Sequence, residues 1–391
     1  MNGSRRENFL VFGKPVLEEA EIEEVVDTLR SGWLGTGPKT TRFENAFKEY
    51  KNASHAVAVN SCTAALHLSL LVAGIGPGDE VITTAMTFCA TINAIIYVGA
   101  TPVLVDIDSV TCNLDPEQVV ARMTERTRAI VPVHFGGYPC DMERLEQIAH
   151  QYGLILIEDC AHAIETEYYG RKAGTIGAFG CFSFYVTKNL TTGEGGMVLT
   201  RRPEDAERVR TLALHGLSQD AWKRFGNEGF KPYQVIDLGY KYNMTDIQAA
   251  LGIHQLRRIE RNWQRRRQIW SIYQEGFASC PVGRPADPPS GIRHGYHLYA
   301  LQWDEQRIGM SRVEFLHAMR MRNIGTSVHY QSIPCHPYYQ DRFGWSPEEY
   351  PVAARMSGTT VSLPMSAGLS DQDVWDVIGA VRQIIAEASA C

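Results

Sequence analysis

The sequence predicts an α/β fold built on a mostly parallel β-sheet that helices cover on both sides. Between about residues 54 and 200, short apolar runs alternate with segments whose apolar residues are spaced along one helical face. The runs are apolar on both faces, which is typical of strands buried within a parallel sheet. The expected strands are His55–Asn60, Glu80–Thr84, Thr101–Asp106, Ala129–His134, Leu154–Glu158 and Cys181–Phe184, and the expected helices are Ala64–Ala73, Pro116–Met123 and Asp141–Tyr152.

The chain of 391 residues is too long for one simple core, so we expect two domains. Residues 1–250 are expected to form the large domain, and residues 251–391 a smaller α+β domain that includes a long connecting helix. That helix is expected from Thr245 to about Gly276, and its six arginines are interpreted as a solvated face because no other basic surface supports nucleic-acid binding. The Pro- and Gly-rich stretch Pro281–Pro289 is expected to be a linker or surface loop.

The composition is ordinary for a soluble globular protein and argues against several classes of function. A net charge of −6 gives no electrostatic reason to bind nucleic acid or an acidic membrane surface. No apolar run approaches the roughly 20 residues that cross a bilayer, and the first residues lack the apolar stretch of a signal peptide. The nine cysteines are scattered singly, without a metal-like His/Cys cluster, so we expect reduced thiols, no metal and a cytoplasmic protein.

Lys188 is the first candidate for chemistry, in a segment from Phe182 to Gly196 that reads FSFYVTKNLTTGEGG. Burying a lysine in such an apolar, β-rich stretch is costly unless its charge is neutralised or paired. The glycines that follow let backbone approach a ligand closely. A Schiff base with an aldehyde would use such a lysine, whereas a surface lysine beside a glycine-rich turn is the alternative.

An acidic pair, Glu158 and Asp159, ends the strongly apolar strand that precedes it. A carboxylate at this place could bind a metal, act as a general base or hold the N–H of a protonated pyridine ring. A metal, however, needs more ligands than this segment offers. The structural alternative is that Asp159 caps the N-terminus of a helix.

A third signature, Asn60–Ala65 with the sequence NSCTAA, turns from an expected strand into an expected helix through small and hydroxylic residues. Free N–H groups at a helix N-terminus bind phosphate, although a simply capped helix has the same pattern. Each of the three signatures follows the end of an expected strand, where ligands bind in parallel sheets. Together they are much more specific than any one of them.

These segments resemble the DegT/DnrJ/StrS family of sugar aminotransferases, within the fold type I group of pyridoxal-phosphate enzymes. The resemblance runs nearly the whole chain, from Ser31–Lys39 (SGWLGTGPK) to Ile324–His329 (IGTSVH). Its most specific part is Phe-Ser-Phe with a lysine five residues after the serine, followed by Glu-Gly-Gly. The resemblance implies a seven-stranded, mostly parallel sheet, a pyridoxal 5′-phosphate cofactor, and Lys188 as its carrier. Dehydratase members of the family carry His at that position, so Lys188 argues against their branch.

The resemblance also implies roles for other residues. Asp159 would hold the ring nitrogen and His162, where many relatives have Gln, would contact the ring hydroxyl. Phe88, which Trp or Tyr can replace in relatives, would stack on the ring. Asn243, in the segment GYKYNMTD, corresponds to a residue that reaches the cofactor phosphate of the partner subunit, which implies a homodimer with shared active sites. Cys62 and Thr63 would contact the cofactor phosphate. Ser183 would add a further contact through its hydroxyl.

The reaction implied by the resemblance is transfer of an amino group from L-glutamate to a nucleotide-linked keto-sugar. The segments at His215–Leu217, Gly239–Asn243 and Val328–Tyr330 look most like those of enzymes that aminate C4 of UDP-linked 4-keto sugars for cell-surface polysaccharide or lipopolysaccharide. His329 is interpreted either as a substrate contact or as a structural residue. The alternatives are a C3 aminotransferase of a dTDP-linked sugar, a cyclitol aminotransferase, and a non-catalytic regulatory protein, which the retained lysine and acidic residues disfavour.

Overall fold

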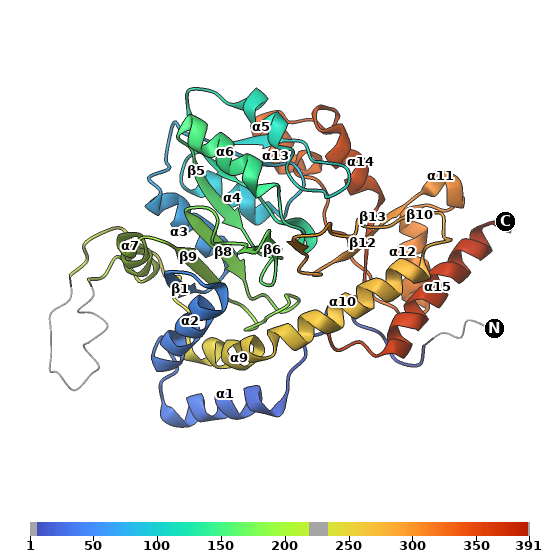
Figure 1. The fold of residues 1–391 in the computed structure, drawn as a ribbon, viewed down its shortest axis with the longest axis horizontal. Helices are drawn as coiled ribbons and strands as arrows, with labels where there is room; N and C mark the ends of the chain where they lie inside the picture. The colour runs from blue at the N-terminus through green and yellow to red at the C-terminus, as the bar shows by residue number, and fades with distance from the viewer. Residues whose placement is uncertain (1–5, 219–233, 390–391) are drawn as a thin grey trace.

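The centre of the molecule is a seven-stranded sheet with the strand order β1-β9-β8-β5-β4-β2-β3 (Figure 1). The structure is a computed structural model, and it describes residues 6–218 and 234–389. The strands from β8 to β3 pair in parallel, whereas β9 is antiparallel to both of its neighbours. β1 therefore runs in the same direction as the parallel strands. The strands are β1 (His55–Val59), β2 (Glu80–Thr84), β3 (Thr101–Val105), β4 (Thr127–Val131), β5 (Ile155–Asp159), β8 (Phe179–Ser183) and β9 (Gly196–Thr200).

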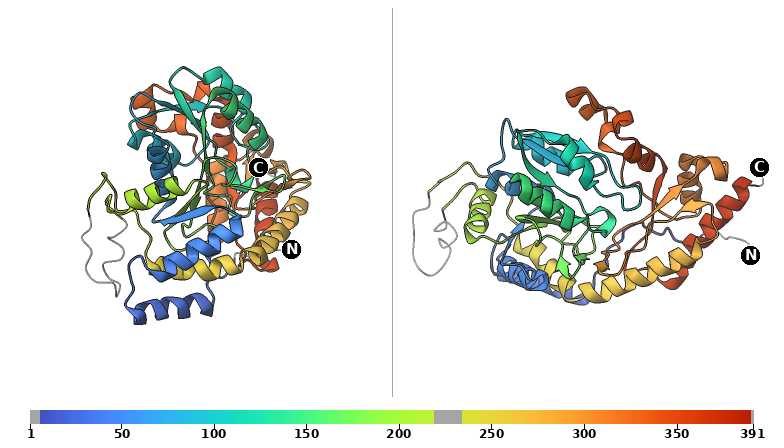
Figure 2. Two further views of the ribbon diagram at one scale, coloured as in Figure 1. Left: turned by 60° about the vertical axis from the view of Figure 1, so that its left-hand side comes forward. Right: turned by 45° about the horizontal axis from the view of Figure 1, so that its top comes forward.

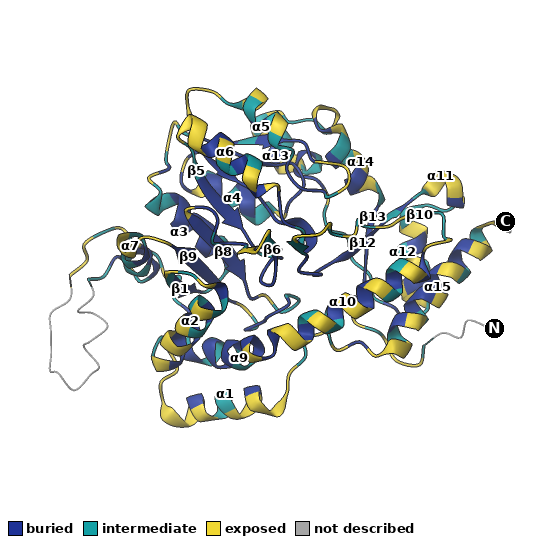
Figure 3. Cartoon of the chain, in the orientation of Figure 1, coloured by how far each residue is buried: buried dark blue, intermediate teal, exposed yellow. Residues whose placement is uncertain are grey.

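Helices cover both faces of this sheet, which confirms the predicted α/β class. Successive residues of a strand point to opposite faces. In β1, Val57 and Val59 pack against one layer of helices, and Ala56 and Ala58 against the other. The strands are accordingly buried along most of their length, as Figure 3 shows. One layer holds α3 (Cys62–Val72), α4 (Cys89–Tyr97) and α7 (Pro203–Ala213), and the other holds α2 (Pro38–Lys51), α5 (Pro116–Arg122), α6 (Met142–Tyr152) and α9 (Asp246–Arg257).

The six predicted strands are all present within a few residues of their expected ends, but β9 is an additional strand. Its apolar residues follow directly after the glycines that end the Lys188 segment, and the sequence analysis does not single them out as a strand. β9 completes the sheet between β1 and β8, and it is the one strand of the seven that runs the other way.

The predicted connecting helix consists of two helices. Thr245 caps the first, α9, whereas α10 (Ile259–Gly276) begins only after Arg258, which has a non-helical backbone (φ −108°, ψ 11°). The interpretation of the arginines as a solvated face is wrong for Arg258 and Arg266, because both are buried. A buried guanidinium needs hydrogen-bond acceptors, and Arg258 donates to the Val16 carbonyl at 2.7 Å.

A second core lies along α10, where α12 (Arg312–Met321) and α15 (Asp371–Ser389) pack with a three-stranded sheet. That sheet consists of β10 (Val282–Gly283), β12 (Tyr299–Trp303) and β13 (Thr360–Leu363). Because β10 lies within Pro281–Pro289, that stretch is not wholly a loop.

The chain returns to the large sheet before it ends. α13 (Pro337–Phe343) and α14 (Pro351–Thr359) lie beside the large sheet in all three ribbon views (Figures 1 and 2). Tyr339 and Ala353 share a core cluster with Ile92 of α4. The division of the chain near residue 250 stays a prediction, and this returning segment ties residues beyond 330 to the large sheet.

The eight cysteines in the described part of the chain are free thiols, and Cys391 lies outside it. Cys160 and Cys181 are buried, and Cys89 is half-buried. Of the helices described, none is long and apolar enough to span a bilayer.

Candidate active site

Three sequence signatures meet at one edge of the large sheet. Asp159 is the last residue of β5, Ser183 is the last residue of β8, and β1 leads into α3, whose first residue is Cys62. Gly196, the first residue of β9, pairs with the last residues of both β1 and β8. Because β1, β5 and β8 run in one direction, their carboxyl ends lie at the same edge, where parallel sheets bind ligands.

Gly196 allows β9 to approach the start of α3. A Cβ atom at this position would lie 2.8 Å from the backbone nitrogen of Cys62, so a larger residue would push the two apart. Ser61 caps α3, because its Oγ accepts from the amide of Ala64 at 3.1 Å. The next amides, of Cys62 and Thr63, have no acceptor within a helix at this position and are available to an anion.

Lys188 follows β8 and lies close to acidic groups of this edge. Its side chain is half-buried, and burial lowers the pKa of the amine to about 8, while the charges of Cys62 and Asp159 act in the opposite direction. Removing the ammonium from water disfavours its charged form. This environment favours the interpretation of Lys188 as a reactive amine over that of a surface lysine.

Asp159 is buried, and its carboxylate accepts two short hydrogen bonds and a long one from the thiol of Cys62, whose sulfur lies 4.0 Å from Oδ1. Its Oδ2 accepts from the hydroxyl of Thr91 at 2.9 Å, and its Oδ1 from the amide of Ala161 at 3.1 Å. Burial raises the pKa of this carboxyl, and the two hydrogen bonds and the charge of Lys188 lower it. The chain after Asp159 forms turns, so the alternative of a helix cap is wrong. Thr91 is not predicted from the sequence, although it lies one helical turn after Phe88.

His162 is buried, and its hydrogen bonds define its protonation. Its Nδ1 accepts from the amide of Gly136 at 3.1 Å, so Nε2 carries the proton and donates to the hydroxyl of Tyr330 at 2.9 Å. Burial and the charge of Lys188 hold the pKa of His162 well below its usual value. Tyr330 has no role in the sequence analysis, although the segment VHY that contains it is singled out there.

Phe88 precedes α4 and its ring is 57% exposed, so one face is open to a ligand. The ring centroid lies 5.8 Å from that of Tyr330. The structure therefore places the predicted stacking residue beside the group that binds His162.

Ser183 and His329 have protein partners of their own. The Oγ of Ser183 accepts from the amide of Tyr185 at 3.4 Å. Nδ1 of His329 lies 2.8 Å from the hydroxyl of Ser362, and burial and the charge of Lys188 lower the pKa of its imidazole to about 4. His329 is thus bonded to Ser362 of β13, and it lies near enough to Lys188 for the charge of that lysine to lower the pKa of its imidazole.

Asn243 lies beside the end of β1, where its backbone pairs with Val59. Its Nδ2 donates to the Thr36 hydroxyl at 2.7 Å. Thr245, and not Asn243, caps the helix that follows. Asn243 therefore has no capping role to explain its presence in this segment.

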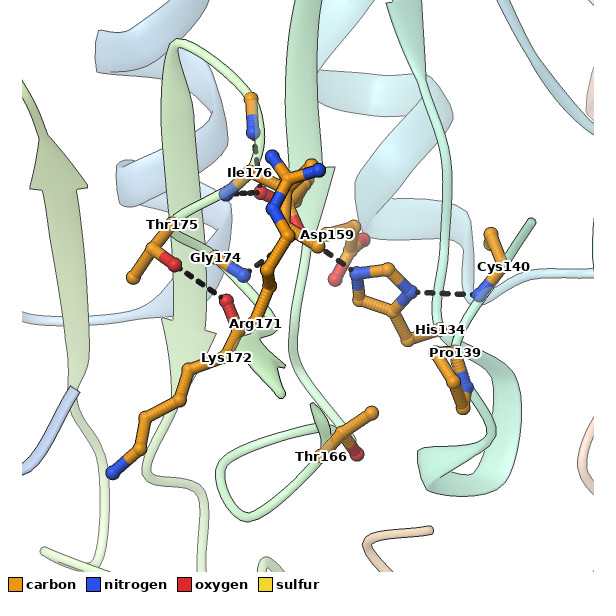
Figure 4. Close-up of polar contacts among 12 residues, drawn as sticks. His134, Pro139, Cys140, Asp159, Thr166, Arg171, Lys172, Gly174, Thr175 and Ile176 are labelled. Carbon is orange, nitrogen blue, oxygen red and sulfur yellow. Dashed lines mark hydrogen bonds and ion pairs between the residues drawn. The ribbon is translucent and has the colours of Figure 1, made fainter. Parts of the chain in front are cut away.

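A buried group of possible metal ligands lies behind the site. Ligand atoms of His134, Glu158 and Cys160 all lie within 4.8 Å of one another. The Glu158 carboxylate, however, accepts from His134 Nε2 at 3.1 Å and from three amides of residues 174–177 at 2.7–2.8 Å. Nδ1 of His134 accepts from the Cys140 amide at 3.1 Å (Figure 4). These contacts satisfy both ring nitrogens and make the group a structural network.

Comparison with known proteins identifies the family. The pattern of the DegT/DnrJ/EryC1/StrS aminotransferase family matches residues 15–382. The chain belongs to this family. The enzyme is 49% identical to the spore coat polysaccharide biosynthesis protein SpsC of Bacillus subtilis, over 97% of this chain and 98% of the relative.

Solved structures of sugar aminotransferases share the fold. The pyridoxal-phosphate form of the putative sugar aminotransferase Spr1654 from Streptococcus pneumoniae is 35% identical, with a TM-score of 0.90 over 97% of this chain and 99% of that one. Helicobacter pylori PseC, an aminotransferase involved in pseudoaminic acid biosynthesis, is 27% identical, with a TM-score of 0.90 over 97% and 100%. The enzyme is thus a sugar aminotransferase that uses pyridoxal 5′-phosphate.

The residues at the sheet edge fit this cofactor. The carboxylate of Asp159 accepts from Thr91, Ala161 and, at a longer distance, the thiol of Cys62, whereas a carboxylate has about four acceptor positions, so it can also take a ring N–H. Its raised pKa reflects a buried carboxylate that a cationic ring nitrogen would stabilise. The start of α3 offers amides to a phosphate, and Lys188 offers an amine to the aldehyde.

Proposed function

We propose that the enzyme transfers an amino group from L-glutamate to C4 of a UDP-linked 4-keto sugar, with Lys188 carrying the cofactor and Asp159 facing its ring nitrogen. The observation that carries this proposal is the meeting of a buried carboxylate, an amine of lowered pKa and a helix N-terminus at one sheet edge.

The protein's own groups would divide the work as follows. Bound pyridoxal phosphate supplies the electron sink that stabilises the deprotonated substrate carbon. Asp159 keeps the ring nitrogen protonated, because a buried carboxylate favours a neighbouring cation. Lys188, once the amino acid has displaced it, takes the α-proton and returns it as a general acid. The remaining proposed contacts are Cys62 and Thr63 with the phosphate, His162 with the ring hydroxyl, Ser183 through its own hydroxyl, and Phe88 with the ring face.

The proposed sugar substrate rests on the resemblance of three segments and on the relatives. SpsC is named for spore coat polysaccharide biosynthesis, and PseC takes part in making pseudoaminic acid. The name of SpsC agrees with a sugar that is destined for a cell-surface glycan. The free cysteines of the described chain favour a reducing compartment, and we place the enzyme in the cytoplasm.

Amination of a panel of nucleotide-linked 3-keto and 4-keto sugars tests the substrate. With L-glutamate as the donor, mass spectrometry is expected to detect the 4-amino product from a UDP-4-keto sugar, with an equal amount of 2-oxoglutarate. Turnover of a dTDP-linked 3-keto sugar or of a keto-cyclitol alone would assign the enzyme to those branches. Binding of the cofactor without any turnover across the panel would favour the regulatory alternative.

The uptake of pyridoxal phosphate by cofactor-free enzyme is expected to quicken with pH and to level off above a midpoint of about 8. The neutral amine is the nucleophile, and burial moves its pKa down from the ordinary value of 10.5. Stopped-flow absorbance at a series of pH values measures this midpoint. Because the charge of Asp159 raises the pKa of Lys188, Asp159→Asn should move the midpoint lower. A midpoint near 10.5 would contradict the buried environment of the amine.

We further propose that two chains form each active site, with Asn243 facing the cofactor phosphate of the partner subunit. Trp33 and Leu34 lie near Thr36, to which Asn243 donates, and Leu238 precedes Asn243 by five residues; all three are exposed apolar side chains. Exposed apolar side chains are candidates for an association surface. Closed two-fold dimers are also the most common assemblies.

A mixture of two inactive variants tests the shared site. In a heterodimer of Lys188→Ala and Asn243→Asp chains, one site would carry both lesions and the other neither, so about half of the wild-type activity per dimer is expected. Asp is chosen because a carboxylate facing phosphate repels it. Tagged heterodimers are purified and assayed beside both parents. Heterodimers that stay as inactive as the parents, while every variant folds and dimerises, would exclude a site shared in this way.

A further inference from the structure

A buried hydrogen-bond network joins Asn189, the residue after Lys188, to Glu165 and to His297 in the C-terminal part of the molecule. Nδ2 of Asn189 donates to both carboxylate oxygens of Glu165, at 3.0 and 2.9 Å, and to the Gly295 carbonyl at 2.8 Å. The amide oxygen of Asn189 is therefore the group that faces His297 Nδ1, 3.0 Å away. Because that oxygen can only accept, His297 Nδ1 carries the proton. None of these residues has a role in the proposed reaction.

His297 in turn reaches His162 by two routes. Its ring centroid lies 4.5 Å from that of His162, with the planes 34° apart. The backbone amides of His297 and Leu298 donate to the Gly136 carbonyl at 3.0 and 3.3 Å, and the amide of Gly136 donates to Nδ1 of His162. Gly136, whose amide sets the protonation of His162, is thus itself held through its carbonyl by the backbone of His297 and Leu298.

This hydrogen-bond network is costly to bury, which argues against a role in packing alone. Glu165 is almost wholly buried, and burial raises the pKa of its carboxyl to about 7, although Arg266 and Asn189 lower it. In the described part of the chain, Nε of Arg266 has no partner. Arg266, Lys188 and Asn189 line a cavity of about 20 Å³, which has room for a water molecule. Apolar side chains would fill this space at a lower desolvation cost.

We propose that Glu165, Asn189 and His297 are positioning residues of the cofactor site. Asn189, clamped between Glu165 and His297, fixes the backbone that carries Lys188. The ring of His297 and the peptide of Gly136 hold His162 in its neutral form, with the Nε2 proton directed at Tyr330. The inference rests on the proposed roles of Lys188 and His162, through which these three residues act.

A pair of substitutions at His297 separates the hydrogen bond from packing. His297→Phe keeps an aromatic ring of similar shape but removes the Nδ1 proton and leaves the Asn189 oxygen unpaired in a buried place. His297→Asn loses the ring but returns an amide N–H near the position of Nδ1. The exposed His150 offers a matched control, His150→Phe.

The readouts are the dissociation constant of pyridoxal phosphate and the pH midpoint of the visible absorption of the bound cofactor, with melting temperature measured alongside. His297→Phe is expected to weaken cofactor binding by about tenfold and to shift the absorption midpoint, since an unpaired buried acceptor is strongly unfavourable. His297→Asn is expected to regain most of this loss, and His150→Phe to match the wild type. If His297→Phe does not fold, Glu165→Gln replaces it, because Gln has the same shape as Glu. This variant should shift the dissociation constant and the absorption midpoint in the same direction as His297→Phe, but by a smaller amount.

The inference would be overturned if His297→Phe or Glu165→Gln lowered the melting temperature but kept the wild-type dissociation constant and absorption midpoint. The hydrogen-bond network would then contribute to stability alone. Equal losses in the Phe and Asn variants would overturn the role of the hydrogen bond. Failure of the underlying assignment is distinguishable. It would appear in the wild-type enzyme, as a cofactor attached to a lysine other than Lys188.

Discussion

Replacing Lys188 by alanine is expected to lower kcat for glutamate-dependent amination by at least about 10⁴. Positioned acid–base catalysis alone contributes about 10²–10⁴ in rate, and the variant also loses the covalent attachment of the cofactor. Initial rates of 2-oxoglutarate formation measure the effect. Part of the activity should return with a small exogenous amine, since the missing group is a proton carrier and the site around Asp159 is intact.

The matched control is Lys172→Ala, which removes another half-buried lysine whose amine bonds to the Tyr50 carbonyl at a distance from the sheet edge. Near wild-type activity is expected of this variant. If Lys188→Ala kept more than about a hundredth of the wild-type kcat without added amine, Lys188 could not be the main acid–base group.

Asp159→Asn is expected to lower kcat by about 100-fold while the variant still binds the cofactor. A neighbouring carboxylate shifts the pKa of a cationic group by about 1–3 units, so its loss leaves the ring nitrogen largely neutral. The Asn side chain has the same shape: its oxygen can still accept from the Ala161 amide, and its NH2 can donate to the Thr91 hydroxyl. Single-turnover kinetics with glutamate, together with a cofactor titration, measure the two effects separately.

Asp141→Asn is the control for Asp159, because Asp141 caps α6 from an exposed position and Asn caps a helix equally well. It should leave both measurements unchanged. An Asp159→Asn enzyme with wild-type kcat would show that the buried carboxylate serves only to order its own turn.

The edge of the sheet could be predicted because its signatures are local. Asp159, Ser183 and Cys62 each lie where an apolar strand ends, and the common direction of buried parallel strands brings such ends together. β9 escaped prediction because its apolar run is short and directly follows a glycine-rich motif, which gives no local sign that a strand begins there. The break at Arg258 escaped because the apolar spacing continues across it, and its cause is tertiary, in the bonds of that arginine to the N-terminal segment.

The partners of the site residues could not be read from the sequence, because they come from distant parts of the chain. Tyr330 lies 168 residues from His162, and His297 lies 108 residues from Asn189. A lone tyrosine or histidine in the C-terminal part carries no local signal of such contacts. The burial of Arg266 has the same origin, since its position is decided by the packing of α10 on segments that precede and follow it.

Reduction of the cofactor-loaded enzyme with borohydride, followed by peptide mapping, tests the central claim most directly. Borohydride makes the bond between lysine and cofactor permanent, so the modified peptide reports which lysine carried it. We expect one pyridoxyl group per chain, on Lys188, and none on the Lys188→Ala protein. Recovery of the group on Lys172, Lys241 or Lys223, the last outside the described residues, would contradict the assignment on which the proposed reaction rests.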